Sequence, residues 1–63
     1  EEVVVAGLRE TTPARLLDAA GRTAWQGTLP RNAARIDLRG LPSGRYVLEL
    51  GLRDAVRLAV MKE

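Results

Sequence analysis

The side chains that could do chemistry in this chain are carboxylates, because its 63 residues include no histidine and no cysteine. Between residues 11 and 62 there are four of them, namely Asp18, Asp37, Glu49 and Asp54. No two stand at a spacing that recurs in an acid/base pair, and a calcium loop needs acidic residues at alternate positions over about 12 residues. We therefore interpret the four as turn caps and solvated charges, and we predict no metal site and no cofactor.

A nucleophile with a partner base is also missing from the sequence. The single serine, Ser43, stands between Pro42 and Gly44 in a segment with the composition of a turn. Nucleophilic catalysis needs a base within hydrogen-bonding reach of the hydroxyl, and the chain has no imidazole to act as one. We predict that the chain is not an enzyme.

Residues 36–50 carry the clearest structural signal. Apolar and polar residues alternate in 36–38 and again in 46–50, which is the period of a strand with one buried face. Gly40, Pro42 and Gly44 lie between the two runs and supply the backbone conformations of a tight reversal. We predict that the two strands face each other across this turn as a hairpin, with Leu41 folding back to fill the end of the core.

The rest of the chain reads as short strands separated by turn signals. We predict strands at residues 3–5, 14–18, 22–27, 34–38, 45–50 and 56–62, joined by a polar connector at 9–13, a turn at 18–21, a loop at 28–32 and a turn at 51–54. This pattern predicts an all-β fold, a small antiparallel β-sandwich or a barrel of six to seven strands, with residues 1–63 as one domain.

The turn at residues 18–21 has a specific chemical basis. Asp18 opens the 18–21 turn, where its carboxylate can accept from backbone N–H groups two or three residues further on, and Gly21 closes it. A short helix over residues 13–20 stays open as an alternative, because Thr12 could cap it and Pro13 could be its first residue.

The composition limits the core. A domain this short buries only about 60% of the surface that its unfolded chain exposes, and this chain has no disulfide or zinc site to compensate. Because phenylalanine is absent, aliphatic side chains must form the core around Trp25 and Tyr46. We interpret Tyr46 as a core residue whose hydroxyl reaches a backbone partner.

The charge pattern limits the partners. The net charge is +2, and nine of the ten basic residues are arginines scattered between Arg9 and Arg57. Nucleic-acid sites normally use clustered basic residues with aromatic side chains among them, so we predict no nucleic-acid partner. No apolar run approaches the ~20 residues that span a bilayer, and we predict no transmembrane segment. Since the chain opens in Glu1-Glu2 without a methionine, we treat it as a module of a longer protein.

Two segments together go beyond a general β pattern. Residues 16–22 read Leu-Leu-Asp-Ala-Ala-Gly-Arg, and residues 36–48 contain Ile-Asp-Leu followed by Leu-Pro-Ser-Gly-Arg-Tyr-Val-Leu. In this order they resemble the C-terminal sorting domain of type IX secretion system cargo proteins. In that family an Asp-x-x-Gly-Arg hairpin precedes an Ile-Asp-Leu-x-x-Leu-Pro-x-Gly-x-Tyr hairpin, and a short basic strand closes the domain. The resemblance covers residues 14–62, and its second motif is the more specific one.

The resemblance implies an immunoglobulin-like sandwich that acts as an export signal. Its partners would be proteins: the secretion translocon, its shuttle components and a sortase-like peptidase. The cargo would be secreted or displayed at the cell surface after passing through the periplasm and the outer membrane. The positions that match the family motifs are Asp18, Gly21, Arg22, Leu41, Pro42, Gly44 and Tyr46, with Lys62 in the terminal basic segment.

The sequence departs from the family in two places. The Asn-Pro segment that usually precedes the first strand is absent, and residues 57–62 hold fewer lysines than the usual last strand. A related possibility is therefore a structural or binding immunoglobulin-like module of an extracellular protein, which shares the Asp-x-x-Gly-Arg and Gly-x-Tyr pattern without the export role.

Alternation also predicts what lies on the second face of the sheets. If the core side chains point inward, five apolar side chains point outward and could form a partner surface together with Lys62; they are Leu17, Trp25, Val47, Ala59 and Met61. The competing interpretation is that so small a sandwich does not separate a buried face from a solvent face completely, so that some apolar side chains are exposed and Trp25 covers an open edge.

Overall fold

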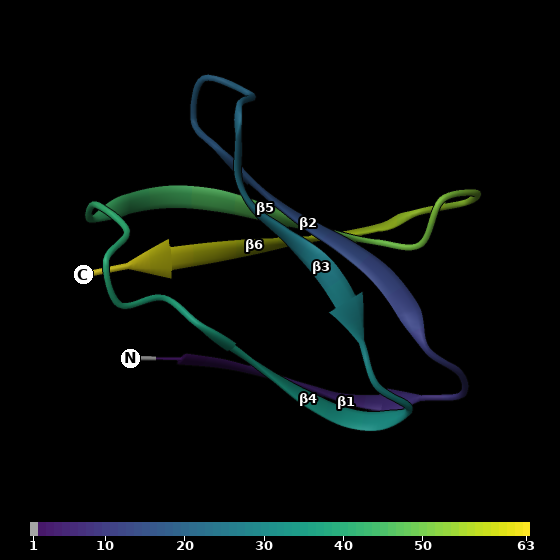
Figure 1. The fold of residues 1–63 in the computed structure, drawn as a ribbon. Helices are drawn as coiled ribbons and strands as arrows, with labels where there is room; N and C mark the ends of the chain where they lie inside the picture. The colour runs from purple at the N-terminus through teal and green to yellow at the C-terminus, as the bar shows by residue number, and fades with distance from the viewer. Residues whose placement is uncertain (1) are drawn as a thin grey trace.

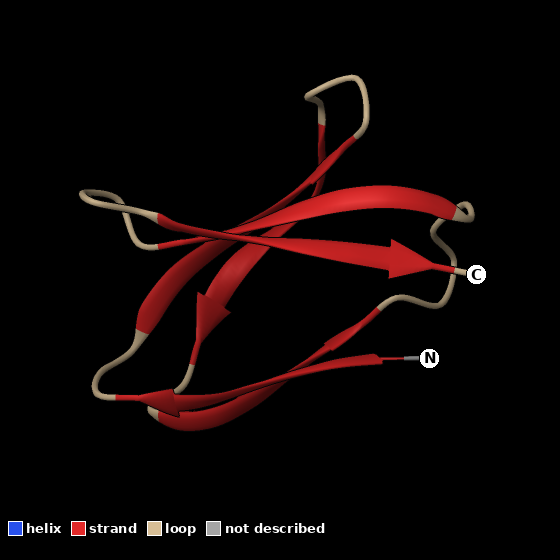
Figure 2. Ribbon diagram, turned by 180° about the vertical axis from the view of Figure 1, so that it is seen from behind, coloured by secondary structure: helices blue, strands red, loops and turns tan. Residues whose placement is uncertain are grey.

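The computed structural model describes residues 2–63, which form six β-strands in two antiparallel sheets (Figure 1). The strands are β1(Glu2–Leu8), β2(Thr12–Asp18), β3(Thr23–Leu29), β4(Asn32–Asp37), β5(Gly44–Leu50) and β6(Val56–Lys62). One sheet pairs β1 with β4, and the other has the order β3-β2-β5-β6. The residues described contain no helix (Figure 2). The prediction of a small all-β sandwich is confirmed.

The core lies between the two sheets and is almost entirely aliphatic. Its buried apolar members are Val5, Ala14, Leu16, Leu29, Ala34, Ile36, Leu38, Tyr46 and Leu48. In β2, β4 and β5 they occupy alternate positions, because successive side chains of a strand point to opposite faces of the sheet. Each fully buried Leu or Ile contributes about 1.5–3 kcal/mol relative to an exposed side chain.

The predicted hairpin within residues 36–50 is wrong. β4 and β5 belong to different sheets, since β4 pairs with β1 while β5 lies between β2 and β6. The segment between them, in which the Leu41 N–H donates to the Leu38 carbonyl at 3.1 Å, carries the chain from one layer to the other. Leu41 is half-buried against the core, as predicted. Alternation and turn chemistry specify a strand on each side of a connection, but not whether those strands pair.

The hydroxyl of Tyr46 fixes this crossover. Tyr46 is buried two residues into β5, and its hydroxyl donates to the Pro42 carbonyl at 2.5 Å. A tyrosine that hydrogen-bonds back to the backbone a few residues upstream is the tyrosine corner of immunoglobulin-type sandwiches. The prediction that the hydroxyl reaches a backbone partner is confirmed.

The sheet order also follows the immunoglobulin pattern. If β1 is aligned with strand B of that fold, the two sheets correspond to B-E and C′-C-F-G. Strand A would lie beside β1, and none of residues 2–63 occupies that position.

The turn between β2 and β3 is built by Asp18 as predicted. The backbone N–H groups of Ala20 and Arg22 both donate to Asp18 Oδ1 at 2.9 Å, and the Gly21 N–H donates to the Asp18 carbonyl at 2.9 Å. Gly21 has φ +85°, a conformation that side chains rarely adopt. The backbone hydrogen bond from Arg22 is the main reason that the pKa of Asp18 lies below its ordinary value.

Several predicted strand limits are wrong by a few residues. The helical alternative over 13–20 is excluded, because β2 begins at Thr12 and includes Pro13. Pro13 is tolerated there because the pairing with β5 begins only at Ala14. Leu29, predicted in a loop, ends β3 as a core residue, and Asn32 begins β4 with φ +81°.

We expect Tyr46→Phe to lower the free energy of unfolding by about 1–3 kcal/mol, because it leaves the Pro42 carbonyl without its partner. In a domain of this size that corresponds to a fall in melting temperature of about 4–8 °C per kcal/mol, measurable by thermal denaturation. Ser43→Ala removes an exposed hydroxyl from the same connection and should change stability by less than about 0.5 kcal/mol. Equal melting of Tyr46→Phe and the parent would contradict the proposed role of the corner.

Candidate protein-interaction face

The strongest candidate site is the outer face of the four-stranded sheet, the side that points away from β1 and β4. Cross-strand register arranges its side chains in rows. Val47 of β5 is opposite Leu17 of β2 on one side and Ala59 of β6 on the other, and these three form the apolar row. Met61 lies next along β6, opposite Arg45.

The apolar row reaches solvent. Leu17 is half-buried, Ala59 and Met61 are exposed, and Val47 is 37% exposed even though it lies on a central strand. The prediction that these four side chains share the outer face is therefore confirmed. Apolar area of this kind is favourable to bury, at about 25 cal/mol per Å² removed from water.

Trp25 does not belong to this face, so that part of the prediction is wrong. It pairs in register with the fully buried Leu16, and paired residues of adjacent strands share a face. Its indole packs against the core and lies over Gly27, where an added Cβ would come within 2.9 Å of Trp25 Cζ2. Simple alternation fails here because a bulge shifts the register between Leu16 and Leu17.

Lys62 also points elsewhere than predicted. It pairs with Gly44, and its ammonium donates to the Leu41 carbonyl at 2.5 Å. The last strand is thereby tied to the crossover segment, and Lys62 is half-buried rather than displayed beside Met61.

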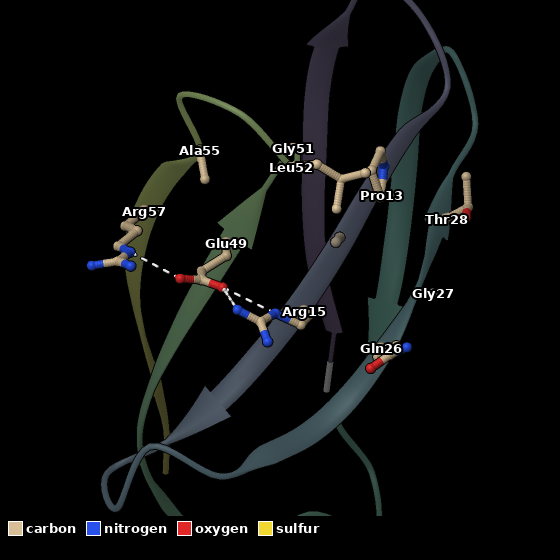
Figure 3. Close-up of a pocket in the computed structure, with 11 residues that line it drawn as sticks. Pro13, Arg15, Gln26, Gly27, Thr28, Glu49, Gly51, Leu52, Ala55 and Arg57 are labelled. Carbon is tan, nitrogen blue, oxygen red and sulfur yellow. Dashed lines mark hydrogen bonds and ion pairs between the residues drawn. The ribbon is translucent and has the colours of Figure 1, made fainter.

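A charged row lies next to the apolar row in the strand register, and Figure 3 shows its side chains. Glu49 of β5 is opposite Arg15 of β2 and Arg57 of β6. The Arg15 Nε donates to Glu49 Oε1 at 3.0 Å, a second Arg15 nitrogen pairs with the same oxygen, and the Arg57 Nε donates to Oε2 at 2.9 Å. Glu49 is only 6% exposed, whereas both arginine side chains are more than half exposed.

The electrostatics of this row favour the ionised form of Glu49. Hydrogen bonding to Arg15 first, and then to Arg57, holds the pKa of Glu49 below its ordinary value, so the carboxylate stays ionised. One carboxylate between two guanidinium groups leaves one net positive charge on the row, with free guanidinium N–H groups at its rim. The row therefore favours a polar or anionic neighbour.

A hollow of about 570 Å³ lies at this end of the face, beside the turn between β5 and β6. Its wall combines the charged row with neutral residues, namely Pro13, Ala14, Gln26, Gly27, Thr28, Gly51, Leu52 and Ala55. Leu52 is largely exposed at its rim. A shallow pocket with an apolar rim and two arginines can receive a side chain of a docked protein.

The two sequence motifs meet at the opposite end of the same sheet. Asp18, from the first motif, is the register partner of Tyr46, from the second, and Gly44 is the register partner of Lys62. Gly21 and Arg22 lie in the turn that follows β2, and the Arg22 Nε donates to Asp18 Oδ2 at 3.2 Å. Nothing in the linear sequence showed that Asp18 and Tyr46, which are 28 residues apart, would be neighbours here.

The other carboxylates act locally. The backbone N–H and side chain of Arg39 both donate to Asp37, which holds the pKa of Asp37 at about 2. Asp54 lies in the exposed β5–β6 turn with φ +49°. Across residues 2–63 there is no group of three or more acidic, histidine or cysteine side chains that could hold a metal ion. Within the same residues no helix is long and apolar enough to cross a membrane.

Trp25→Ala should lower the free energy of unfolding by about 1–3 kcal/mol, since it uncovers Gly27 and removes a half-buried indole from the core edge. Chemical denaturation measures the loss. Leu52→Ala, at an exposed turn position, should stay within about 0.5 kcal/mol of the parent. If the two variants unfold alike, Trp25 does not contribute to the core.

Glu49 should make stability depend on pH. Because its folded pKa lies below the ordinary value of 4.5, its contribution is complete above that pH and is lost as pH falls through the folded pKa. Between about pH 7 and about pH 3 the urea midpoint of Glu49→Gln should therefore fall less than that of the parent. Asp18 and Asp37 are present in both proteins, so their contributions to the pH dependence cancel in the comparison. Glu10→Gln serves as a control at an exposed position. Parallel curves for the parent and Glu49→Gln would contradict this.

Comparison of the chain with protein-family models, with curated proteins and with solved structures found no match. Its function therefore has to be inferred from the motifs and from the geometry of the outer face.

Proposed function

We propose that this chain is a protein-recognition module that serves as a C-terminal sorting domain for export by a type IX secretion system. The observation that carries the proposal is that both motifs and the terminal Lys62 converge around Tyr46 at one end of the four-stranded sheet. The motif residues then have a single task, which is to hold the last two strands in a fixed shape. The export machinery would recognise that shape.

Recognition in this scheme uses the outer face of β2, β5 and β6. The apolar row would supply the buried area, and the exposed parts of Arg15, Arg45 and Arg57 would set the orientation of the partner. The partners would be translocon, shuttle and sortase-like proteins, and the attached cargo would reach the cell surface or the medium. The domain itself performs no reaction in this scheme.

A second candidate function is a binding module of an extracellular protein. The hollow beside Glu49 favours it, because this hollow lies at the end of the sheet away from the motifs and is not needed to hold them. In that case the same face binds a partner, but export does not depend on it.

Export of a fused reporter tests the proposal. The reporter, placed before residues 1–63, should leave the cell in a bacterium that has a type IX system and should stay in the periplasm when that system is deleted. Val47→Asp places a charge in the apolar row and should lower export about tenfold, the change that a loss of about 1.4 kcal/mol of binding produces.

The matched control is Ala33→Asp, which adds the same charge at an exposed position of β4, in the other sheet. Circular dichroism on both purified variants establishes that they are folded. Retention of a folded parent fusion in the periplasm would overturn the sorting role and leave the binding module. Equal export of Val47→Asp and Ala33→Asp would show that the outer face is not the surface recognised.

A further inference from the structure

The outer face of the four-stranded sheet has a third row, which forms the floor of the hollow. Pro13 stands two residues before Arg15 in β2, so both side chains lie on the same face. Ala55 has the same relation to Arg57 of β6, and Gly51 joins them because its N–H donates to the Pro13 carbonyl at 2.8 Å. We call Pro13, Gly51 and Ala55 the small row. Their side chains occupy little volume, so the face is hollowed there.

The small, charged and apolar rows follow one another at a constant step along the strands. Along β5 and the residue after it they are marked by Gly51, Glu49 and Val47, each two residues from the next. A two-residue step of a strand covers about 6.6–6.8 Å, since each residue rises about 3.3–3.4 Å. The face therefore presents a hollow with an apolar floor, then a positively charged row, then the apolar row.

The charged row has hydrogen-bond donors that Glu49 does not use. Glu49 accepts from the Nε of Arg57, and within residues 2–63 the two terminal nitrogens of that guanidinium have no hydrogen-bond partner. One terminal nitrogen of Arg15 is unpaired in the same part of the chain. Figure 3 shows Glu49 between the two guanidinium groups, with Ala55 and Leu52 toward the β5–β6 turn. Since paired guanidinium N–H groups match the two oxygens of a carboxylate, Arg57 can bind a second carboxylate.

We propose that the outer face binds an extended segment of a partner protein with the pattern apolar-x-acidic-x-apolar. Alternate side chains of an extended segment point to one side and follow one another at the same step of about 6.6–6.8 Å. When the segment lies along β5, its acidic side chain meets the terminal nitrogens of Arg57. One apolar side chain then enters the hollow and the other packs on the apolar row. Because the pattern is symmetrical, it fits in either chain direction.

The charge of the row selects a carboxylate on a longer segment. One net positive charge is left after Glu49 is paired with two arginines, and an Asp or Glu side chain of the partner brings one negative charge. A phosphate group carries about 1.5 to 2 negative charges at pH 7 and would leave an excess beside the ionised Glu49. A free carboxylate ion would use the charged row only, whereas a segment also buries the apolar surface on either side of that row.

This inference rests on the part of the proposed function that makes the outer face a recognition surface, and not on export. Direct binding to the purified chain tests it without a secretion system. Peptide binding without export of the reporter would count against the sorting role alone. Export without peptide binding would count against this inference alone.

Titration of the 63-residue chain with a synthetic peptide, followed by NMR of its backbone and arginine Nε–H groups, provides the test. The probe is acetyl-Thr-Leu-Thr-Glu-Thr-Leu-Thr-amide, for which we expect a dissociation constant of about 1 mM or below and the largest shifts at Val47, Gly51 and Arg57. Replacing Glu by Gln in the peptide should weaken binding about fivefold, because the charge-assisted pair is lost. A peptide of the same composition, acetyl-Thr-Thr-Leu-Glu-Leu-Thr-Thr-amide, directs Leu and Glu to opposite sides and should also bind about fivefold more weakly.

Variants of the chain locate the site. Arg57→Lys keeps the charge beside Glu49 but loses the paired N–H groups, so it should weaken binding of the Glu peptide about fivefold. Arg53→Lys, in the neighbouring turn and outside the lining of the hollow, should leave binding unchanged. Ala55→Glu removes no partner of Glu49, yet it places a carboxylate in the hollow two residues from Arg57 and should weaken binding at least as much. Ala33→Glu adds the same charge on the other sheet and should not.

Circular dichroism of each variant establishes that its strands are folded. If Arg57→Lys unfolds, Ala55→Glu carries the test. No NMR shift with up to about 10 mM peptide, ten times the expected dissociation constant, overturns the proposal. So does equal binding of the Glu and Gln peptides, and so does equal weakening by Ala55→Glu and Ala33→Glu.

Discussion

The hydrogen bond from the Tyr46 hydroxyl to the Pro42 carbonyl is the contact on which the sandwich depends. The chain has to leave the two-stranded sheet after β4 and enter the middle of the four-stranded sheet as β5, and this bond defines the place of the crossing. Leu41 seals the core beneath the crossing, and Lys62 ties the final strand to the same segment. A core without phenylalanine has few other large side chains to fix the relative position of its layers.

The only carboxylate in the charged row of the outer face is paired, and one net positive charge remains there. Glu49 is nearly buried, but two guanidinium groups neutralise it and supply its hydrogen bonds, so the outer face carries no free acid. The ion pairs of Asp18 with Arg22 and of Asp37 with Arg39 are exposed and local, and they shape turns more than they stabilise the fold. What remains available to a partner is the apolar row, Met61 and the rims of the arginines.

The molecule thus has two surfaces of different character. The outer face of β2, β5 and β6 is a side-chain surface, suited to recognition of a folded module by another protein. Within residues 2–63 the outer edges of β1 and β6 have no strand partner, so they form a backbone surface.

The sequence alone was enough for the fold class, the Asp18 turn, the core role of Tyr46 and the outward direction of Leu17, Val47, Ala59 and Met61. Each of these depends on residue type and on the two-residue period of a strand, which are local properties. The pairing of strands was decided by tertiary structure: residues 36–50 are not a hairpin, because β4 pairs with β1 in one sheet and β5 lies between β2 and β6 in the other. Tertiary structure also decided the direction of Trp25, through a bulge that alternation cannot reveal. Tertiary structure also decided the exposure of Val56 and Leu58 on the inner face of β6. It results from the unequal width of the two sheets and from no property of these two residues themselves.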